Sequence, residues 1–353
     1  MAKSIIFGVG EEFLRRDGLA EQIAPWEDGL RAPTAPGSFE WWYFDAHLED
    51  GSTVVIVFAT KPMLERNGPL KPTLLLTLTR PDGKKLDRSR SYPAAQFSAA
   101  KERCDVTIGG SRVCGDLHCY ELHAANEDLA ADLVFTGIVP AWRPGSGKNY
   151  YDPALQRYFA WLPPIPYGKV EGTLTYDGQR RTVSGVGYHD HNWGNVGLND
   201  VMSHWYWGRA RLGDYSLIFV EMTAAPAYGG QKIPVFLLTK GDQILIGDGT
   251  PLTLTTADVV AHPGGREYPR QVDFHWQPPQ NNAGSVHLKL RQPALIEASS
   301  LLATFPRWQQ ILLRLFANPY YFRFNAALEL RIDLPGLQAF EQGPALYEMM
   351  LLR

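Results

Sequence analysis

The amino-acid sequence predicts an all-β protein made of two β-barrel or β-sandwich domains. Short apolar runs recur along the chain and are broken by Gly, Pro, Asn and Asp, as in "STVVIVFAT" at 52–60 and "YSLIFVEM" at 215–222. Three of these breaks, "RPDGKK", "TYDGQR" and "TKGDQI", have the residues of tight hairpin turns. Many short strands joined by such turns are typical of sandwiches and barrels.

Length and a weak internal repeat predict the division into two domains. The chain has 353 residues, which is more than one hydrophobic core usually holds. Residues 41–56 align without gaps on residues 205–220, and each stretch begins with tryptophan. We therefore expect one domain at 1–200, which carries "EWWYFD" and "GYHDHNWG", and a second at 201–353.

One amphipathic helix is predicted near 301–317, in "LLATFPRWQQILLRLF". Its apolar residues recur at helical spacing. Such a helix most often packs across the end of a barrel. The alternative is an interfacial helix that admits an apolar substrate from a membrane.

Composition excludes several classes of protein. The 34 basic and 37 acidic residues give a net charge of −3 with no basic block, so a nucleic-acid partner is not expected. No stretch approaches the roughly 18 apolar residues of a membrane span. The three cysteines have no disulfide or zinc spacing. We expect a cytoplasmic protein, with peripheral membrane association as the alternative, and the sequence leaves the oligomeric state open.

The stretch "SGVGYHDHNWGN" at 184–195 concentrates polar side chains on a predicted strand. It follows the hairpin sequence "TYDGQ" and is expected to form its second strand. Alternate residues of a strand share a face, so Tyr188, Asp190 and Asn192 point the same way. Such groups are costly to bury unless they are hydrogen-bonded or functional. We take these three as the candidate catalytic residues.

The opposite face of the same strand presents a competing interpretation. His189 and His191 share that face, and His204 follows them, which is a combination that can bind a metal. No third ligand has a diagnostic spacing, and no phosphate loop, dinucleotide fingerprint or nucleophile elbow is present. We therefore expect neither a metal nor a cofactor. A slip of one residue in the strand register would exchange the two faces.

Aromatic segments elsewhere in the chain predict the walls of an apolar pocket. They are "FEWWYFD" at 39–45, "YFAWLPPIPYGKVEG" at 158–172 and "HWYWGRA" at 204–210. Aromatic walls with a few converging polar groups are typical of sites for apolar ligands, although any single tryptophan fits an ordinary core equally well. The residues expected to bind substrate are Glu40, Trp42, Trp161, Trp205, Trp207 and Arg209.

Four of these motifs together resemble one protein family. "EWWYFDAHL", "YFAWLPPIPYGKVEG", "GYHDHNWGN" and "WYWGRARLGDYSLIF" look like the carotenoid hydratase (hydroxyneurosporene synthase) and lipocalin-like superfamily, which also includes lipocalin-like Diels–Alderases. The resemblance implies two lipocalin-like (calycin) β domains with a ligand cavity. In the hydratase pattern a Tyr-x-Asp-x-Asn-x-Gly motif carries the proposed acid, and Tyr188, Asp190, Asn192 and Gly194 match it.

The hydratase segment departs from that pattern at one position. Phe159 stands two residues before Trp161, where the resemblance leads us to expect a histidine. The motifs on either side of this position are intact, so the departure does not affect the expected fold. It does put a carotenoid substrate in doubt.

The resemblance implies an enzyme that acts without a cofactor on the C=C bonds of an apolar isoprenoid or polyene. In a hydratase, burial would raise the pKa of Asp190 so that it protonates the bond, and Tyr188 and Asn192 would orient the acid or the attacking water. The neighbouring tryptophans would stabilise the cation. The alternatives are a pericyclase, which folds a polyene without proton transfer, and a carrier that leaves its ligand unchanged.

Overall fold

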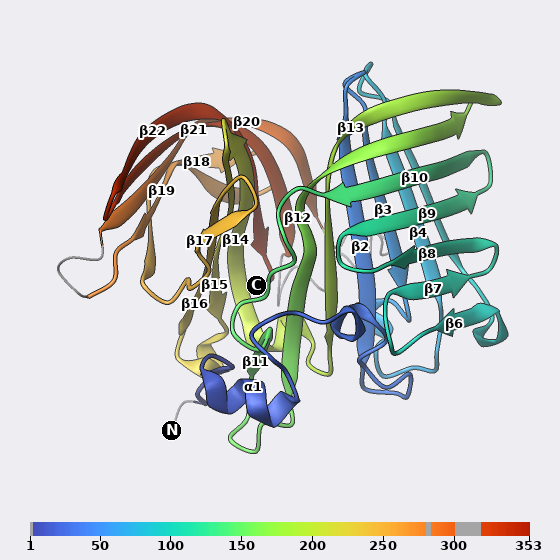
Figure 1. Ribbon diagram of the computed structural model, residues 1–353, viewed down its shortest axis with the longest axis horizontal. Coiled ribbons are helices and arrows are strands. Elements are labelled where there is room, and N and C mark those ends of the chain that lie inside the picture. The colour runs from blue at the N-terminus through green and yellow to red at the C-terminus, as the bar shows by residue number, and fades with distance from the viewer. Residues whose placement is uncertain (1–2, 280–283, 301–318) are drawn as a thin grey trace. The chain divides into compact units, whose positions relative to one another are not determined.

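The computed structural model describes residues 3–279, 284–300 and 319–353, and it confirms the all-β prediction (Figure 1). The chain divides into two compact units. The N-terminal unit is Ile6–Gly197, and the C-terminal unit is Leu198–Arg353 together with the first residues of the chain up to Ile5. The helix predicted near 301–317 lies outside the described residues.

The N-terminal unit is a curled antiparallel sheet with a few short helices. Its strand order is β5-β4-β3-β2-β13-β12-β10-β9-β8-β7-β6, and β11 pairs with both β1 and β12. Its elements are β1 (Ile6–Phe7), α1 (Glu11–Asp17), η1 (Pro25–Asp28), β2 (Phe39–Leu48), β3 (Thr53–Ala59), η2 (Met63–Glu65), β4 (Thr73–Thr79), β5 (Lys85–Ser91), η3 (Ala94–Gln96), β6 (Phe97–Ala99), β7 (Asp105–Ile108), β8 (Ser111–Gly115), β9 (Cys119–Asn126), β10 (Leu129–Gly137), β11 (Lys148–Tyr150), β12 (Tyr158–Tyr176) and β13 (Gln179–Gly194).

The C-terminal unit is a second antiparallel sheet, in the order β17-β16-β15-β14-β22-β21-β20-β19-β18. Its elements are α2 (Leu198–Val201), β14 (Met202–Leu212), β15 (Tyr215–Ala224), η4 (Pro226–Tyr228), β16 (Lys232–Lys240), β17 (Gln243–Ile246), β18 (Leu252–His262), β19 (Arg266–Trp276), β20 (Ser285–Ser300), β21 (Tyr320–Leu334) and β22 (Leu337–Leu351). No helix among the described residues is long and apolar enough to cross a membrane.

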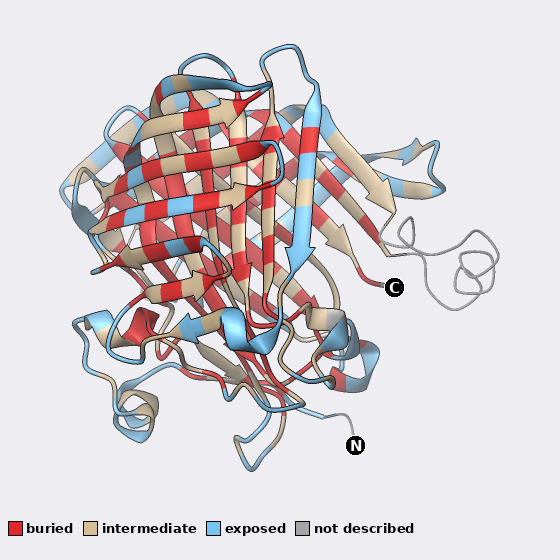
Figure 2. Cartoon of the chain, turned by 90° about the vertical axis from the view of Figure 1, so that its right-hand side faces the viewer, coloured by how far each residue is buried: buried red, intermediate tan, exposed pale blue. Residues whose placement is uncertain are grey.

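Side chains alternate between a buried and a more exposed face along strands such as β3, β4 and β21, and Figure 2 shows bands of buried and less buried residues. In the N-terminal unit, Trp42 and Phe44 of β2 are buried together with Ile56 of β3, Leu76 of β4 and Leu122 of β9. The curl of the sheet brings these inward faces together around one apolar core. The alternating strands therefore present one set of residues to the core and the alternate set outward.

The hairpin β12–β13 is the longest in the N-terminal unit and carries the predicted site. Its two strands are joined by Asp177 and Gly178, and both have positive φ (52° and 68°), as a type I′ hairpin turn requires. The pairing of β12 with β13 shifts between Leu162 and Ile165 and again between Ile165 and Gly168. Proline has no N–H to donate, so the prolines of "WLPPIPYG" account for this irregular stretch directly after Trp161.

Candidate active site

The predicted catalytic residues lie on the outward face of β13. Strand β13 pairs with β2 so that Asp190 lies opposite Tyr43 and Tyr188 lies opposite Asp45. Directly opposite residues of an antiparallel pair share a face of the sheet, so Tyr43 and Asp45 belong to the same outward surface. Asn192 shares it as well, two residues along from Asp190.

Three side chains hold the carboxyl group of Asp190. The indole N–H of Trp161 donates to Oδ2 at 2.9 Å, and the Tyr188 hydroxyl donates to the same oxygen at 2.8 Å. The Asn192 amide donates to Oδ1 at 2.6 Å. The structure therefore brings together Asp190, Tyr188, Asn192 and Trp161, which the sequence nominated from two separate motifs.

The surroundings of Asp190 favour its neutral form. Burial raises the pKa of Asp190, and this effect exceeds the opposing hydrogen bonds from Trp161, Tyr188 and Asn192, which favour the carboxylate. The residue keeps some exposed surface, whereas Tyr188 and Asn192 are buried. Asp190 is therefore a carboxylic acid of raised pKa on a residue that is only partly covered.

Two further aromatic rings pack against the side chains that bind Asp190 Oδ2. Trp142 contacts Trp161 edge-on at 5.9 Å between ring centroids, and Tyr43 contacts Tyr188 in the same manner at 6.3 Å. The sequence analysis missed Trp142 and Tyr43. Tyr43 belongs to "EWWYFD", and the register of β2 against β13 was the information needed to find it.

Glu40 and Trp42 do not lie beside Asp190, contrary to the expectation that they would bind the same substrate. They are one residue out of phase with Tyr43, so their side chains enter the core on the other face of β2. Glu40 accepts hydrogen bonds at 2.7 Å from the backbone N–H groups of Arg31 and Ala32, and both Glu40 and Trp42 are fully buried.

The two histidines of β13 also point into this core. His191 lies between two carboxylates, with Nε2 at 2.7 Å from Glu40 Oε1 and Nδ1 at 3.2 Å from Asp28 Oδ1. Its ring stacks on Trp42 at 4.7 Å between centroids. His189 donates from Nδ1 to the backbone carbonyl of Tyr43 at 2.9 Å. The alternation of faces therefore places Asp190 outward and both histidines inward.

Asp28 is the centre of this buried cluster. Its Oδ2 accepts a hydrogen bond from the Tyr120 hydroxyl at 2.5 Å and lies 3.3 Å from His189 Nε2. Burial alone would raise the pKa of Asp28, but His189 and His191 outweigh it and lower the pKa well below its usual range. Burial likewise opposes the charged form of His191, but its bonds to Asp28 and Glu40 raise its pKa.

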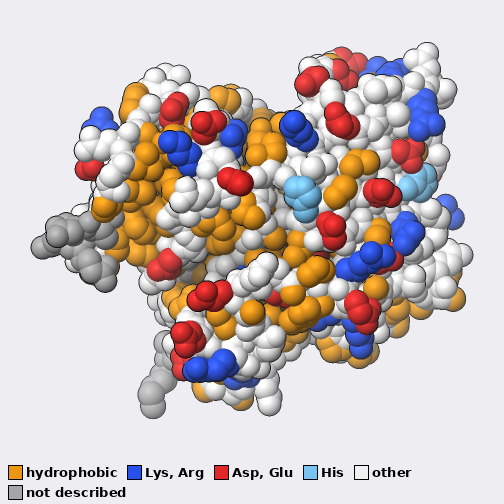
Figure 3. Space-filling model, viewed as in Figure 1, with side chains coloured by type: hydrophobic (Ala, Val, Ile, Leu, Met, Phe, Trp, Pro, Cys, Tyr) orange, Lys and Arg blue, Asp and Glu red, His pale blue; other side chains and the backbone are white. Residues whose placement is uncertain are grey.

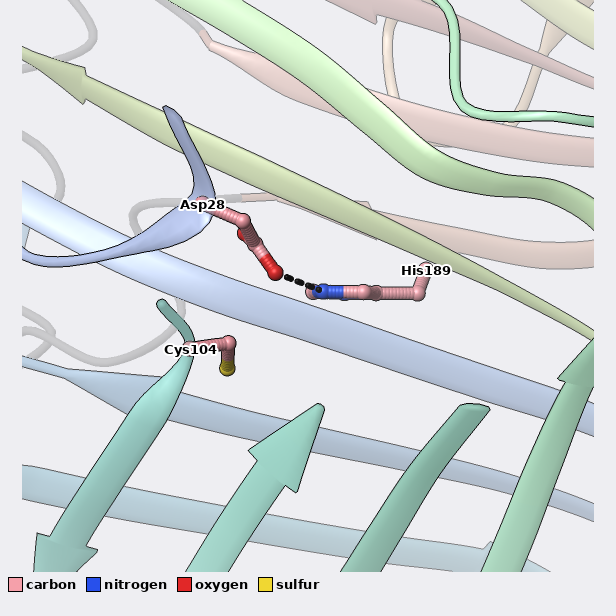
Figure 4. A group of neighbouring side chains, drawn as sticks. All are labelled: Asp28, Cys104 and His189. Carbon is pink, nitrogen blue, oxygen red and sulfur yellow. Dashed lines mark hydrogen bonds and ion pairs between the residues drawn. The ribbon is translucent and has the colours of Figure 1, made fainter. Parts of the chain in front are cut away.

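Among the described residues, one group has donor atoms close enough to share a metal ion, and all three residues are buried. Oxygen, sulfur and nitrogen atoms of Asp28, Cys104 and His189 lie within 4.8 Å of one another, and Figure 4 shows these side chains from η1, the segment before β7, and β13. Asp28 is already engaged by Tyr120 and His189. The cluster ties η1 to β13 through these contacts.

The remaining predicted binding residues belong to the C-terminal unit. Trp205, Trp207 and Arg209 lie on one face of β14, and the Arg209 guanidinium lies 5.9 Å from the centre of the Trp207 ring. His204, the third histidine of the competing metal interpretation, is also in this unit, where its Nε2 is hydrogen-bonded to the Thr223 hydroxyl at 3.1 Å.

The C-terminal unit also exposes apolar side chains. Figure 3 shows hydrophobic side chains gathered over its strands, and Val259, Ile296 and Phe340 are more than half exposed. Surfaces of this kind are found where proteins contact apolar partners. Peripheral membrane contact stays a prediction.

Comparison with known proteins identifies similar chains. The Diels-Alderase-like family model matches residues 128–262. A quinolone epoxide rearrangement protein of Emericella nidulans is 38% identical over 232 residues, which cover 60% of each chain. An acyclic carotenoid 1,2-hydratase of Rubrivivax gelatinosus is 27% identical over 52% of this chain and 48% of its own length. The chain spans between 48% and 61% of the length of the curated relatives it matches.

Solved structures show the same fold. The crystal structure of CghA with Sch210972 superposes with a TM-score of 0.60 and 13% identity over 99% of both chains. At this level of identity the similarity establishes the architecture of two lipocalin-like β domains and nothing further.

Proposed function

Because the chain belongs to the lipocalin-like hydratase and Diels–Alderase superfamily, we propose that it is a cofactor-independent enzyme in which Asp190 protonates a C=C bond of an apolar isoprenoid or polyene. The observation that carries this proposal is the carboxyl group of Asp190. It has a raised pKa, three hydrogen-bond donors and aromatic neighbours, and it belongs to a partly exposed residue on the outward face.

Protonation of an isolated C=C bond needs a neutral, well-placed acid. The raised pKa of Asp190 retains the proton to higher pH than an ordinary aspartic acid does. Trp161 and Tyr188 both bind Oδ2, while Oδ1 receives one bond, from Asn192. Oδ1 is therefore the oxygen that carries the proton toward the substrate. The rotation of the carboxyl group is fixed by donors on both oxygens.

The resulting carbocation must be stabilised by groups that do not themselves form a bond to it. The faces of aromatic rings attract cations, and each is worth roughly 0.5–2 kcal/mol depending on how far water is excluded. Trp161 and Tyr43 provide such rings next to Asp190. Addition of water to the cation completes a hydration, the reaction for which the relative in Rubrivivax gelatinosus is named.

An epoxide is the second candidate for the group that is protonated. The relative in Emericella nidulans is named for a quinolone epoxide rearrangement and has the higher identity of the two relatives described. Acid transfer to an epoxide oxygen would use the same carboxyl group, so Asp190 has the same role in both reactions.

Comparison of the wild type with Asp190→Asn tests the proposal. The substrates are lycopene as an acyclic carotenoid and a quinolone epoxide, and products are identified by mass spectrometry. We expect a product about 18 mass units heavier than lycopene, or an isomer of the epoxide, with the wild type. Loss of a positioned acid costs about 10²–10⁴-fold in rate. Asp177→Asn, in the exposed β12–β13 turn, is the matched control and should retain full activity.

Other outcomes distinguish the remaining functions. A cyclised product of unchanged mass that forms equally well with Asp190→Asn would indicate a pericyclase. Saturable binding with no chemical change in any ligand would indicate a carrier. Either result would remove Asp190 from the proposed role.

A further inference from the structure

Two tyrosine–aspartate pairs lie side by side on the outward face of the N-terminal unit. On β13 the Tyr188 hydroxyl donates to Asp190 Oδ2 at 2.8 Å, and on β2 the Tyr43 hydroxyl donates to Asp45 Oδ2 at 3.0 Å. In each pair the two residues are two positions apart on one strand. Across the strands, each aspartate lies opposite the tyrosine of the other pair.

The two pairs differ in which member can be reached. In the pair on β13 the tyrosine is buried, with 1% of its surface exposed, and Asp190 is partly exposed. In the pair on β2 the order is reversed, because Asp45 is 3% exposed and Tyr43 is partly exposed. The partly exposed member is therefore the aspartic acid on β13 and the tyrosine on β2.

A hydration needs two proton transfers, one from an acid to the C=C bond and one from water to a base. The two pairs offer an aspartic acid for the first transfer and a tyrosine for the second. We propose that Tyr43 is a catalytic residue that accepts the proton of the attacking water while it passes its own proton to Asp45, so that the two residues form the general base. This inference rests on the proposed function of Asp190 as the acid and adds the nucleophile's half of the reaction.

Protons and electron pairs balance over the two steps of the proposed hydration. Asp190 gives its proton to one carbon of the C=C bond, whose electron pair forms the new C–H bond and leaves a carbocation on the other carbon. A water molecule forms a C–O bond to that carbon as its proton moves to the Tyr43 oxygen and the Tyr43 proton moves to Asp45. The product is an alcohol, Asp190 is left ionised and Asp45 protonated. Exchange with solvent restores both.

The positions of the two pairs suit their separate roles as acid and base. Residues diagonal to one another on neighbouring antiparallel strands have Cα atoms roughly 7–8 Å apart, so Asp190 and Asp45 occupy separate positions on this face. Asp190 and Tyr43 are directly opposite, and the rings of Tyr43 and Tyr188 touch edge-on. The acid and the hydroxyl of the base thus face the same patch of surface.

Deuterium labelling separates protonation from water addition. The wild type, Tyr43→Phe, Asp45→Asn and Asp190→Asn are incubated with lycopene in D2O, and hydrated product and deuterium in the recovered lycopene are both measured by mass spectrometry. We expect Tyr43→Phe and Asp45→Asn to lose at least tenfold in hydration while deuterium still enters recovered or isomerised lycopene, because the cation forms and then loses a proton. Asp190→Asn should give neither signal.

Tyr188→Phe is the matched control for Tyr43→Phe. Each change removes one hydroxyl and keeps the ring, but Tyr188 belongs to the acid's pair, so its variant should retain the wild-type ratio of hydration to deuterium exchange. Circular dichroism confirms that each variant is folded. If folded Tyr43→Phe hydrates lycopene as fast as the wild type does, the inference is wrong while the role of Asp190 stands. If the wild type neither hydrates lycopene nor exchanges deuterium into it, both the proposed hydration and this inference fail.

Discussion

The indole nitrogen of Trp161 lies 2.9 Å from Asp190 Oδ2, although the two residues come from different strands and are 29 positions apart in the chain. Trp161 is directly opposite Asn192 on β13, and Asn192 binds the other oxygen of the same carboxyl group. The carboxyl group is therefore held from both sides by donors whose positions are set by strand pairing. This relationship links the register of the sheet to the chemistry proposed for it.

Removal of the indole donor should shift the pH dependence of activity. The Trp161 hydrogen bond favours the carboxylate form and so lowers the pKa of Asp190. Trp161→Phe keeps an aromatic ring and deletes the N–H, so the pKa of Asp190 should rise further. Activity that depends on the protonated acid falls as pH rises through this pKa, and the falling limb should therefore move to higher pH. Rates measured across pH for the wild type and the variant check this, and an unmoved limb would contradict it.

The raised pKa of Asp190 should also appear in protein stability. A carboxyl group whose pKa is higher in the folded state than in the unfolded state binds its proton more tightly when folded. Its contribution is present in full below 3.8, the ordinary pKa of an aspartic acid, and is lost as pH rises through the folded pKa. Asp190→Asn has no ionisable group at this position, so the cost of ionising the buried carboxyl group disappears. The Asn192 side chain can rotate its amide so that its oxygen accepts from the amide of the introduced asparagine. Urea unfolding at pH 7 should give a free energy of unfolding no lower than that of the wild type. A clearly less stable variant would show that the carboxylate is favoured in the fold.

The buried cluster should be essential for stability. Glu40→Ala removes one of the two carboxylate partners of His191 and leaves the backbone N–H groups of Arg31 and Ala32 without their acceptor. Breaking a buried charge pair by removing one partner costs about 3–5 kcal/mol. Chemical denaturation should show a loss of this size. Glu12→Ala, at an exposed position of α1, should leave the free energy of unfolding within about 0.5 kcal/mol of the wild type.

The shared face of Tyr188, Asp190 and Asn192 could be predicted from the sequence, but its direction could not. The expectation was that these three residues point into the β domain, whereas the core holds His189 and His191. The turn at Asp177 and Gly178 locates the start of the strand, and a period of two then places Tyr188, Asp190 and Asn192 together. Trp161 was nominated from its own motif, without its pairing partner. The all-β fold class could be predicted from the hairpin turns and the short apolar runs, because these features recur along many strands of both units.

The face of β2 could not be assigned in the same way. Trp41, Trp42, Tyr43 and Phe44 are all aromatic, so hydropathy does not alternate there and gives no sign of which residues enter the core. Only the pairing of β2 with β13 shows that Tyr43 faces the site and Trp42 does not. Asp28 was missed for a related reason, since it lies in a short 3₁₀ helix and the partners of its carboxylate, Tyr120 and His189, are distant in sequence.

The most direct test of the account is the incorporation of deuterium from D2O into lycopene by the wild type and by Asp190→Asn. The account predicts deuterium at the carbon that Asp190 protonates with the wild type, and at least a hundredfold less with the variant. Equal incorporation by both proteins, or product formation by the wild type without any deuterium, would contradict the role of Asp190 as the acid.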